Sequence, residues 1–252
     1  MYNGRPEKIV ATIEARMTSS RLRGKVLLPI AGKPALAMLI ERAKRSRYLD
    51  GICVATTTNK DDDPLVELAT ELHVGFFRGS ESDVLERVVA AAESMHADTI
   101  VELTGDCPFV DPLLVDRAIE EFFTHDVDYA SNTLVATYAN GFDVQVFPTK
   151  VLREVASLTE DAVDRTHVSY YIYNHPDRYR CHNWRADEES YGPDLRVTLD
   201  EETDYMALTR LAEALLPTNP HFSAKDVTQY LRAHPEIIEI NRQVRQKEVR
   251  EL

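Results

Sequence analysis

Residues 8–25, KIVATIEARMTSSRLRGK, join a short apolar run to a loop rich in arginine. The run KIVATI has the β-branched composition of a buried strand. In an open parallel α/β sheet, the loop after the first strand is the usual phosphate-binding place. Arg16, Arg21, Arg23 and Lys25 stand in that loop without an intervening acid, although the whole chain has a formal net charge of -13. The stretch therefore predicts the fold class and a local anion site together.

The alternation that begins there continues along the first half of the chain. Strand followed by helix in regular order is the signature of a parallel sheet covered on both sides. We therefore expect an α/β fold, Rossmann-like, with three layers and a mostly parallel sheet. Apolar runs predict further strands at 51–56, 74–78 and 98–103, and amphipathic stretches predict helices at 34–46, 62–72 and 82–97.

The rhythm of the sequence changes after about residue 125, which predicts an inserted α+β lid segment at about 130–185 and a helical tail at 216–252. No composition shift or linker divides the chain, so we expect one domain over residues 1–252. The periodicity in this half predicts strands at 142–147, 179–185 and 194–199, and helices at 148–157, 160–174 and 223–237.

Composition excludes several classes of protein. The 42 acidic residues exceed the 29 Lys and Arg, which argues against a broad nucleic-acid-binding face. No run approaches the roughly 20 apolar residues of a membrane-spanning helix. Cys53, Cys107 and Cys181 are widely spaced and form no CxxC pair, so neither a disulfide framework nor a zinc site is indicated. We expect a cytoplasmic protein with no nucleic-acid or membrane partner.

The basic loop offers the chemistry that a triphosphate requires. It contains hydroxyl groups, a glycine for a tight backbone, arginine forks and a lysine point charge. It matches neither the GxGxxG dinucleotide fingerprint nor the GxxxxGK[ST] phosphate loop. A solvated basic loop is the alternative interpretation, with Gly24 as a simple turn residue.

Two aspartates are candidates for a divalent cation site. Asp106 follows the strand at 98–103, and Asp200 ends the apolar run LRVTLD. Carboxylates at strand ends can supply the oxygen ligands that Mg²⁺ prefers. As isolated features, Asp106 would be a turn residue and Asp200 a helix cap.

The loop is similar to the R-x-x-S-x-R-L-P-G-K signature of the cytidylyltransferases that activate sugars and sugar acids, the acylneuraminate and ketodeoxyoctonate type. Within this group the chain most resembles the spore-coat polysaccharide biosynthesis branch. The resemblance covers nearly the whole chain and implies a nucleotide-diphospho-sugar transferase fold and a homodimer. Further matching stretches, in order, are FRGSESDVLERVVAAAE, VELTGDCPFVDP, GFDVQVF, RTHVSYYIYNHPDRY and LRVTLDEETDY.

The resemblance also implies roles for individual residues. It gives Asp106 and Asp200 to the metal, Mg²⁺, and the nucleobase side to the segment around residues 80–83. Ser80 and Asp83 are alternatively caps of the following helix, and Arg165 alternatively pairs with Asp161 or Asp164 on its own helix. The implied catalytic residues are Arg16, Arg21 and Lys25; the nucleotide-binding residues are Ala15, Arg16, Arg21, Gly24, Lys25, Ser80, Asp83 and Asp106; the acceptor-binding residues are Asp143, Gln145, Arg165 and His167.

Two positions depart from the family pattern. Arg23 stands where the loop usually has proline, and Gln145 stands where a glutamate is common. The predicted activity is transfer of CMP from CTP to a sugar or sugar acid, with release of pyrophosphate. Use of another nucleoside triphosphate, a phosphonate acceptor, or a noncatalytic nucleotide-binding role are the alternatives.

Overall fold

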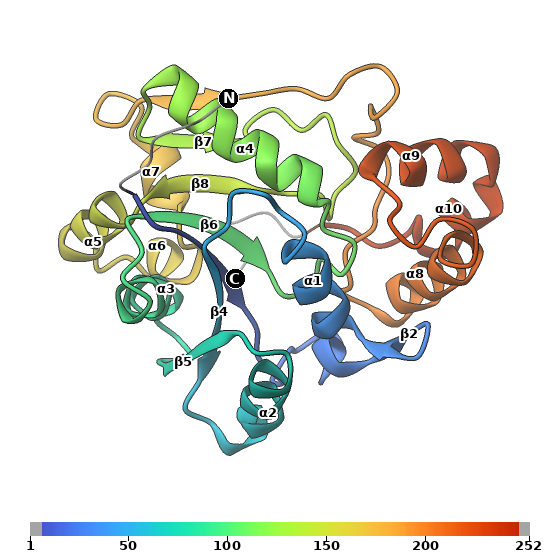
Figure 1. The fold of residues 1–252 in the computed structure, drawn as a ribbon, viewed down its shortest axis with the longest axis horizontal. Coiled ribbons are helices and arrows are strands. Elements are labelled where there is room, and N and C mark those ends of the chain that lie inside the picture. Colours follow the sequence, from blue (N-terminus) through green and yellow to red (C-terminus); the bar gives the residue numbers. More distant parts are fainter. Residues whose placement is uncertain (1–6, 247–252) are drawn as a thin grey trace.

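The computed structural model describes residues 7–246, and within them a mostly parallel sheet forms the centre of the molecule (Figure 1). Its seven strands lie in the order β5-β4-β1-β6-β8-β7-β9. Only β8 runs against its neighbours, since β6 and β7 both pair with it antiparallel. The strands are β1 Ile9–Glu14, β4 Gly51–Thr57, β5 Gly75–Gly79, β6 Thr99–Thr104, β7 Tyr129–Ser131, β8 Gln145–Pro148 and β9 Cys181–Asn183.

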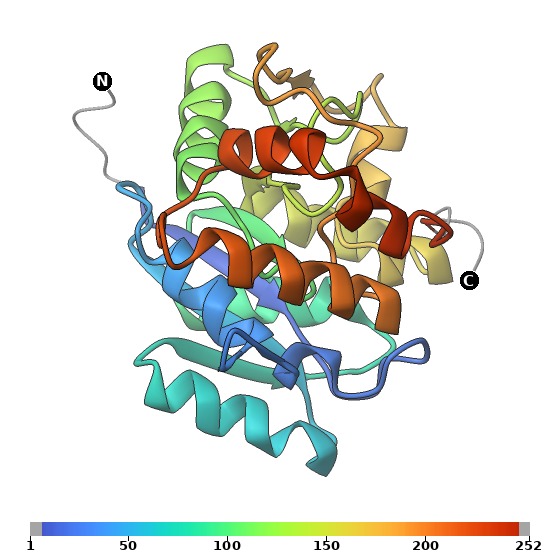
Figure 2. The same cartoon turned by 90° about the vertical axis from the view of Figure 1, so that its right-hand side faces the viewer.

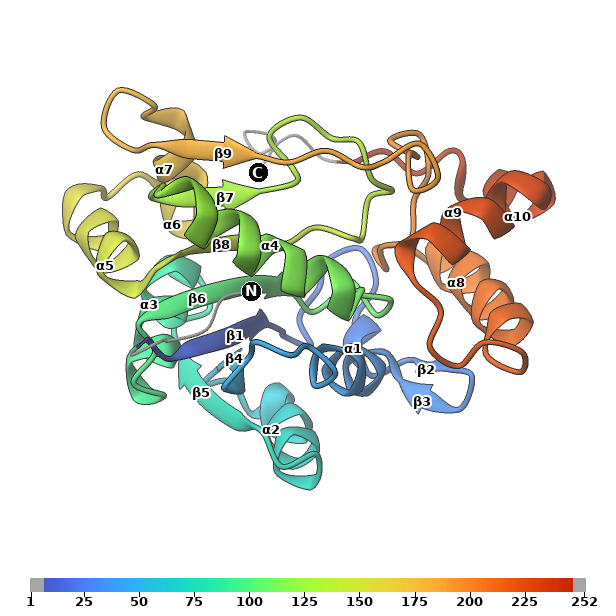
Figure 3. The ribbon, with the colours of Figure 1, turned by 45° about the horizontal axis from the view of Figure 1, so that its top comes forward.

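Helices cover both faces of this sheet, as Figure 3 shows. Apolar side chains that alternate along the strands fill two separate cores, because successive residues of a strand point to opposite faces. Ile9, Ala11 and Ile13 join one core, whereas Val10 joins the other. The first core packs against α1 Ala35–Ala43, α2 Asp63–Glu71 and α4 Pro112–His125; the second packs against α3 Val84–Ser94, α5 Thr149–Leu158 and α7 Tyr170–Asn174, with the short α6 Ala162–Thr166 beside α3.

Three helices near the C-terminus lie beside the sheet rather than over it (Figure 2). They are α8 Glu202–Leu215, α9 Ala224–Ala233 and α10 Pro235–Asn241. Leu208 and Val227 join the first core. The hydroxyl of Tyr205 donates to the carbonyl of Pro29 at 2.8 Å, which ties α8 to the small hairpin of β2 Pro29–Ile30 and β3 Lys33–Pro34. Every helix of the described residues is too short or too polar to cross a membrane.

The predicted α/β class and parallel core strands are confirmed, but three predicted elements differ. The helix expected at 160–174 is two short helices, α6 and α7. The helix expected at 223–237 breaks at His234, since Pro235 disfavours a helical conformation in the residue before it. The strand expected at 194–199 forms only a bridge between Arg196 and Asn140. Residues 247–252 of the predicted tail lie outside the described residues.

The strands of the inserted segment extend the central sheet. In chain order, β7 precedes the insertion's helices and β9 follows them, and these two strands pair with each other in parallel. The parallel strands β1, β4, β5 and β6 end at one edge of the sheet, where the loops that follow them meet. That edge carries the side chains on which the functional interpretation depends.

Candidate active site

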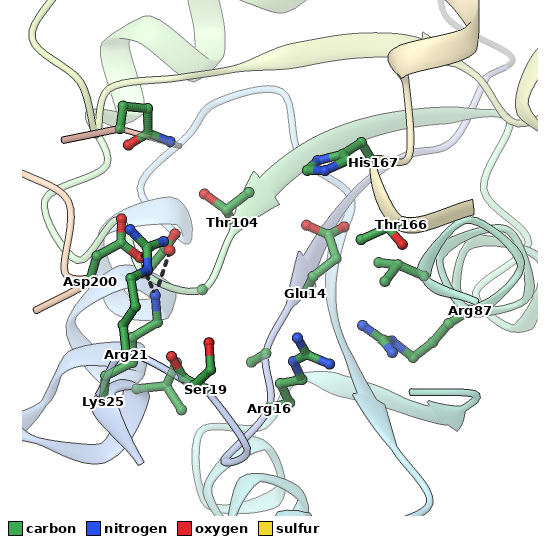
Figure 4. A pocket seen from close by; sticks show the side chains of 17 residues that line it. Glu14, Arg16, Ser19, Arg21, Lys25, Arg87, Thr104, Thr166, His167 and Asp200 are labelled. Atoms are coloured by element: carbon green, nitrogen blue, oxygen red, sulfur yellow. Dashed lines mark hydrogen bonds and ion pairs between the residues drawn. The ribbon is translucent and has the colours of Figure 1, made fainter. Parts of the chain in front are cut away.

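A cleft of about 370 Å³ opens at the carboxyl edge of the sheet. Its lining has two ends, which Figure 4 shows from close by. Arg21, Lys25 and Asp200 gather at one end, where an ion-pair network joins them. Glu14 and His167 lie toward the other end, with Thr104 between the two groups. The cleft therefore has a cationic end and a separate polar end.

Gly24 sets the direction of the basic loop. Its φ of 70° lies in the left-handed region, which glycine adopts without a steric penalty. Its N–H donates to the carbonyl of Met17 at 2.9 Å and closes the loop into a tight turn. A short 3-10 helix, Lys25–Leu27, starts at the next residue and buries the Lys25 side chain. Gly24 itself does not line the cleft, so its contribution is to aim Lys25.

Acidic side chains of two neighbouring loops hold the basic loop in place. Asp62 accepts a hydrogen bond from the N–H of Met17 at 2.7 Å. Glu81 accepts one from the Thr18 hydroxyl and pairs with Arg16 at 3.3 Å. These acids follow β4 and β5 in sequence, so three strand ends cooperate in shaping one loop.

The four cations of the loop have different surroundings. Arg23 pairs with Asp61 at 2.5 Å, and its side chain is 76% exposed. This residue fits the solvated-loop interpretation. Arg21 and Lys25 turn inward and line the cleft, as Arg16 and Ala15 also do. The anion-site interpretation is thus restricted to the part of the loop that faces the cavity.

Lys25 lies between the two aspartates that the sequence singles out. Its Nζ donates to Oδ2 of Asp106 at 2.8 Å and to Oδ1 of Asp200 at 2.7 Å. Burial alone would lower the pKa of Lys25, but the two carboxylates outweigh it and raise that pKa. Burial would likewise raise the pKa of Asp200, but Lys25, Arg21 and Arg196 hold it below its usual value. The Lys25 ammonium and the Asp200 carboxylate are therefore both charged at neutral pH.

Backbone contacts bring Asp106 and Asp200 together. Gly105 donates its N–H to the carbonyl of Glu14 at 2.9 Å, and a Cβ at this position would lie 2.6 Å from that oxygen. Only glycine permits so close an approach. The N–H of Leu199 donates to the carbonyl of Asp106 at 2.8 Å. This bond fixes Asp200 beside the end of β6, 94 positions after Asp106 in the numbering.

The cap of α8 is not Asp200. Glu201 is the N-cap residue, and it forms a capping box with Asp204. Arg196 bridges Asp200 and Asp204. Its terminal nitrogen lies 2.7 Å from a carboxylate oxygen of Asp200, and its Nε lies 2.9 Å from one of Asp204. Contacts with cations therefore orient the Asp200 carboxylate, which lines the cleft. Sequence reasoning did not single out Arg196, although it stands four residues before Asp200 in the same apolar run.

The donor set at this end of the cleft fits a divalent cation. Oxygens of Asp106 and Asp200 converge on one point, since both are within 2.8 Å of the same nitrogen. The ammonium of Lys25 stands in for a cation there. Two carboxylate oxygens open to a cleft are typical of a Mg²⁺ site, where water and phosphate oxygens complete the coordination.

Three largely buried acids lie around the cleft; Glu14 lines its polar end, whereas Glu102 and Asp143 do not line it. Glu14 and Glu102 lie on the adjacent strands β1 and β6 and interact electrostatically. Burial, followed by the charge of Glu102, raises the pKa of Glu14 well above its usual value. Burial raises the pKa of Glu102 to about 7 and, together with the charge of Asp106, that of Asp143 to about 6. The pKa values of Glu102 and Asp143 therefore lie close to neutral pH.

The residues expected to contact the base have structural partners. Ser80 accepts a hydrogen bond from the N–H of Asp83 at 3.1 Å, and Asp83 caps α3 by accepting from the N–H of Glu86 at 3.0 Å. Neither lines the cleft. The capping alternative therefore describes Asp83, whereas Ser80 holds the backbone of the turn that precedes the cap.

The residues expected to contact the acceptor are divided. His167 lines the cleft, whereas Asp143, Gln145 and Arg165 do not. Gln145 accepts hydrogen bonds from Tyr129 and from Ser169. These bonds occupy the amide oxygen at the position where the family commonly has a carboxylate.

Arg165 is fully engaged within its own part of the fold. It donates to the carbonyls of Ala156 at 2.7 Å and Thr159 at 2.9 Å, and it pairs with Asp83 at 3.2 Å and with Glu160 at 3.3 Å. It therefore joins α5 and α6 to the start of α3. The expected pairing partners, Asp161 and Asp164, are not those found.

Several lining residues escaped sequence reasoning. Glu14 ends β1 and looks like the last residue of an alternating strand, Thr104 ends β6, and Arg87 lies on the buried face of the amphipathic helix α3. All three line the cleft. The one signal for Arg87 in the sequence is a charged residue among apolar residues on the helix face expected to pack on the sheet.

Comparisons with known proteins agree with this arrangement. The family model described as Cytidylyltransferase matches residues 10–243. An uncharacterized protein of Methanocaldococcus jannaschii is 34% identical over 245 residues, 97% of this chain and 99% of that protein. The spore coat polysaccharide biosynthesis protein SpsF of Bacillus subtilis is 33% identical over 234 residues, 90% of this chain and 95% of that protein.

A solved structure extends the likeness to three dimensions. A cytidylyltransferase from Leptospira borgpetersenii superposes with a TM-score of 0.88 and 28% sequence identity, covering 96% of this chain and 100% of that one. The Rossmann-like nucleotide-diphospho-sugar transferase fold, with its inserted α+β segment, is thereby confirmed.

Proposed function

The chain belongs to the cytidylyltransferase family and is a nucleotidyltransferase, and from this premise we propose that it transfers CMP from CTP to a sugar or sugar acid and releases pyrophosphate. The observation that carries the proposal is the convergence of Arg21 and Lys25 with Asp106 and Asp200 at one end of the cleft. A noncatalytic nucleotide-binding module would have no use for the paired carboxylates.

The residues of the basic loop hold the triphosphate in this proposal. Arg16, Arg21 and Lys25 bind its oxygens, and Ala15 and Gly24 shape the backbone around it. Lys25 and Arg21 neutralise the charge that grows on the phosphate oxygens as the acceptor oxygen attacks the α-phosphorus in line. Positioning and charge stabilisation supply most of the rate, so no covalent intermediate with the protein is needed.

Asp106 and Asp200 hold Mg²⁺ in this proposal. When bound, the ion neutralises phosphate charge and orients the leaving pyrophosphate. Arg196 fixes the Asp200 carboxylate through its second oxygen, and the Gly105 backbone fixes Asp106.

The polar end of the cleft receives the base and the acceptor. Ser80 and Asp83 support the base side through the start of α3, from which Val84 and Arg87 line the cleft. His167 contacts the acceptor. Asp143, Gln145 and Arg165 support the wall behind it. A phosphonate acceptor and a base other than cytosine are the competing versions of this function, and the acceptors and nucleotides assayed below separate them.

Two further parts of the proposal concern the setting of the enzyme. We place the reaction in the cytoplasm, as the widely spaced Cys53, Cys107 and Cys181 suggest, since each of them is a free thiol. We also propose a homodimer that uses the segment at about 130–185. Leu134 and Val135 are exposed apolar residues of this segment and support the assignment.

Pyrophosphate release tests the activity directly. The purified protein is incubated with CTP, Mg²⁺ and a panel of neutral sugars, sugar acids and a phosphonate, and pyrophosphate is followed by a coupled assay. We expect release with CTP and at least one acceptor, and none with the Lys25→Ala variant. Release with another nucleotide and not with CTP would contradict the cytidylyl assignment, and binding of nucleotide without release for any acceptor would favour the noncatalytic role.

A further inference from the structure

Lys25 takes the position that a metal ion shared by Asp106 and Asp200 would need. Its Nζ lies 2.8 Å from one carboxylate and 2.7 Å from the other. The side chain of Lys25 is only 11% exposed, so this contact differs from a surface ion pair between solvated side chains. Asp200 is more deeply buried still, at 3% exposed. The contact is thus a packed feature of the cleft.

A divalent cation and this ammonium exclude each other. Mg²⁺ binds carboxylate oxygens at about 2.0–2.1 Å, closer than the hydrogen-bonding distance of the ammonium to the same oxygens. Two cations that shared Oδ2 of Asp106 and Oδ1 of Asp200 would lie within a few ångströms of each other and repel strongly in a partly buried site. One must leave before the other can bind.

The remaining cations make the closed arrangement stable without any metal. Arg21 pairs with Oδ1 of Asp200 at 2.8 Å, and Arg196 pairs with Oδ2 of the same residue at 2.7 Å. Together with Lys25, these two arginines balance the negative charges of Asp106, Asp200 and Asp204. Little attraction is left for a free divalent cation.

A phosphate group changes this balance. Lys25 lines the same cleft as Ser19, Ser20 and Arg21, so an anion bound by the loop competes with the carboxylates for the ammonium. We infer that Lys25 closes the Asp106–Asp200 cation site until a triphosphate draws its ammonium away, so that the divalent cation binds together with the nucleotide and not before it. This inference rests on the proposed function, because it assumes that the loop binds phosphate.

Binding of Mn²⁺ alone tests the exclusion without nucleotide and without turnover. Mn²⁺ is titrated into the protein, and the free ion is measured by its electron paramagnetic resonance signal, for the wild type, Lys25→Met and Lys25→Arg. We expect Lys25→Met to bind Mn²⁺ at least about tenfold more tightly than the wild type, since a tenfold change needs only a modest loss of repulsion. Lys25→Arg keeps the positive charge and should stay as weak as the wild type.

A double variant locates the site. Adding Asp106→Asn to Lys25→Met should abolish the gain. Equal Mn²⁺ affinity of the wild type and Lys25→Met, or a gain that survives Asp106→Asn, would overturn the inference. If circular dichroism shows that Lys25→Met does not fold, Lys25→Gln takes its place, because its amide can still donate to one carboxylate.

The same proteins separate this inference from the proposed function. Calorimetric titration with CTP in the presence of Mg²⁺ reports nucleotide binding independently of the Mn²⁺ result. CTP binding with no effect of Lys25→Met on Mn²⁺ would remove the inference alone. A Mn²⁺ gain in Lys25→Met with no CTP binding by the wild type would keep the exclusion and remove the cytidylyl function.

Discussion

The Nζ atom of Lys25 donates to Oδ1 of Asp200 at 2.7 Å, across a separation of 175 residues in the sequence. Lys25 ends the loop after the first strand, and Asp200 precedes the helix α8. A contact over so long a separation exists only in the folded chain, and it joins the expected phosphate-binding loop to the expected metal ligand. The following predictions depend on that junction and on the groups around it.

Replacing Lys25 should damage turnover far more than folding. We expect Lys25→Met to lower kcat by about 10²–10³, the usual cost of removing one group that stabilises transition-state charge. Asp200 keeps its contacts with Arg21 and Arg196, which limits the loss of stability. Arg23→Met is the matched control, because Arg23 lies in the same loop but is exposed. Turnover of Lys25→Met above about a tenth of the wild-type value would refute the role of Lys25.

The two aspartates should differ in their effect on stability. Asp200 is 3% exposed and contacts three cations, so Asp200→Asn leaves buried charge uncompensated and should cost about 3–5 kcal/mol. Asp106 is 24% exposed and pairs only with Lys25, so Asp106→Asn should cost about 1 kcal/mol or less. Urea unfolding followed by circular dichroism measures both. Equal losses of unfolding free energy in the two variants would show that the contacts of Asp200 with its three cations add no more stability than the single ion pair of Asp106.

Arg165 separates a structural role from an acceptor-binding role. Arg165→Ala leaves the carbonyls of Ala156 and Thr159 without their donor, which should cost about 1–3 kcal/mol. Thermal unfolding would show a lower Tm, and KM for the acceptor would change little. A large increase in KM with an unchanged Tm would instead support direct contact with the acceptor.

Glu102 should make stability depend on pH. Its pKa of about 7 in the folded protein exceeds the usual 4.5, so the folded state retains a proton that the unfolded state loses. Stability of the wild type should therefore fall as pH rises from about 4.5 to about 7 and then level off, by up to about 3 kcal/mol. Glu102→Gln should make this fall smaller, and the raised pKa values of Glu14 and Asp143 account for what remains.

The control for this prediction is a surface glutamate. Glu93→Gln should give no gain in stability at pH 8, since Arg153 lowers the pKa of Glu93 and its contribution is lost only toward acid pH. Urea unfolding at pH 5 and pH 8 measures both variants. A fall in stability that is as large in Glu102→Gln as in the wild type would assign the effect to another group, with Glu14 the first to examine.

Local pattern was sufficient to predict the parallel core and the place of the basic loop after the first strand, where it lines the cleft. The run KIVATI and the loop that follows it are contiguous, and their chemistry follows from residue type. Asp106 could be placed because it directly follows a predicted strand. Its pairing with Asp200 came from the family resemblance, since nothing local in LRVTLD specifies a partner 94 positions away.

Sequence reasoning could not give the tertiary surroundings of several side chains around the cleft. Arg165 has a side chain suited to a carboxylate, but its donors are taken by carbonyls of α5 and by Asp83, at a separation of 82 residues. Glu14 and Glu102 look like strand residues, and only their register on neighbouring strands makes them a coupled acid pair. Burial of this kind depends on tertiary packing, which periodicity does not specify.

Calorimetric binding of CTP, UTP, ATP and GTP, with and without Mg²⁺, to the wild type and to Asp106→Ala tests the central claim most directly. The account predicts selective binding of CTP that requires Mg²⁺ and weakens in Asp106→Ala. Equal binding of all four nucleotides, or binding of none, would contradict the assignment of the cleft to CTP.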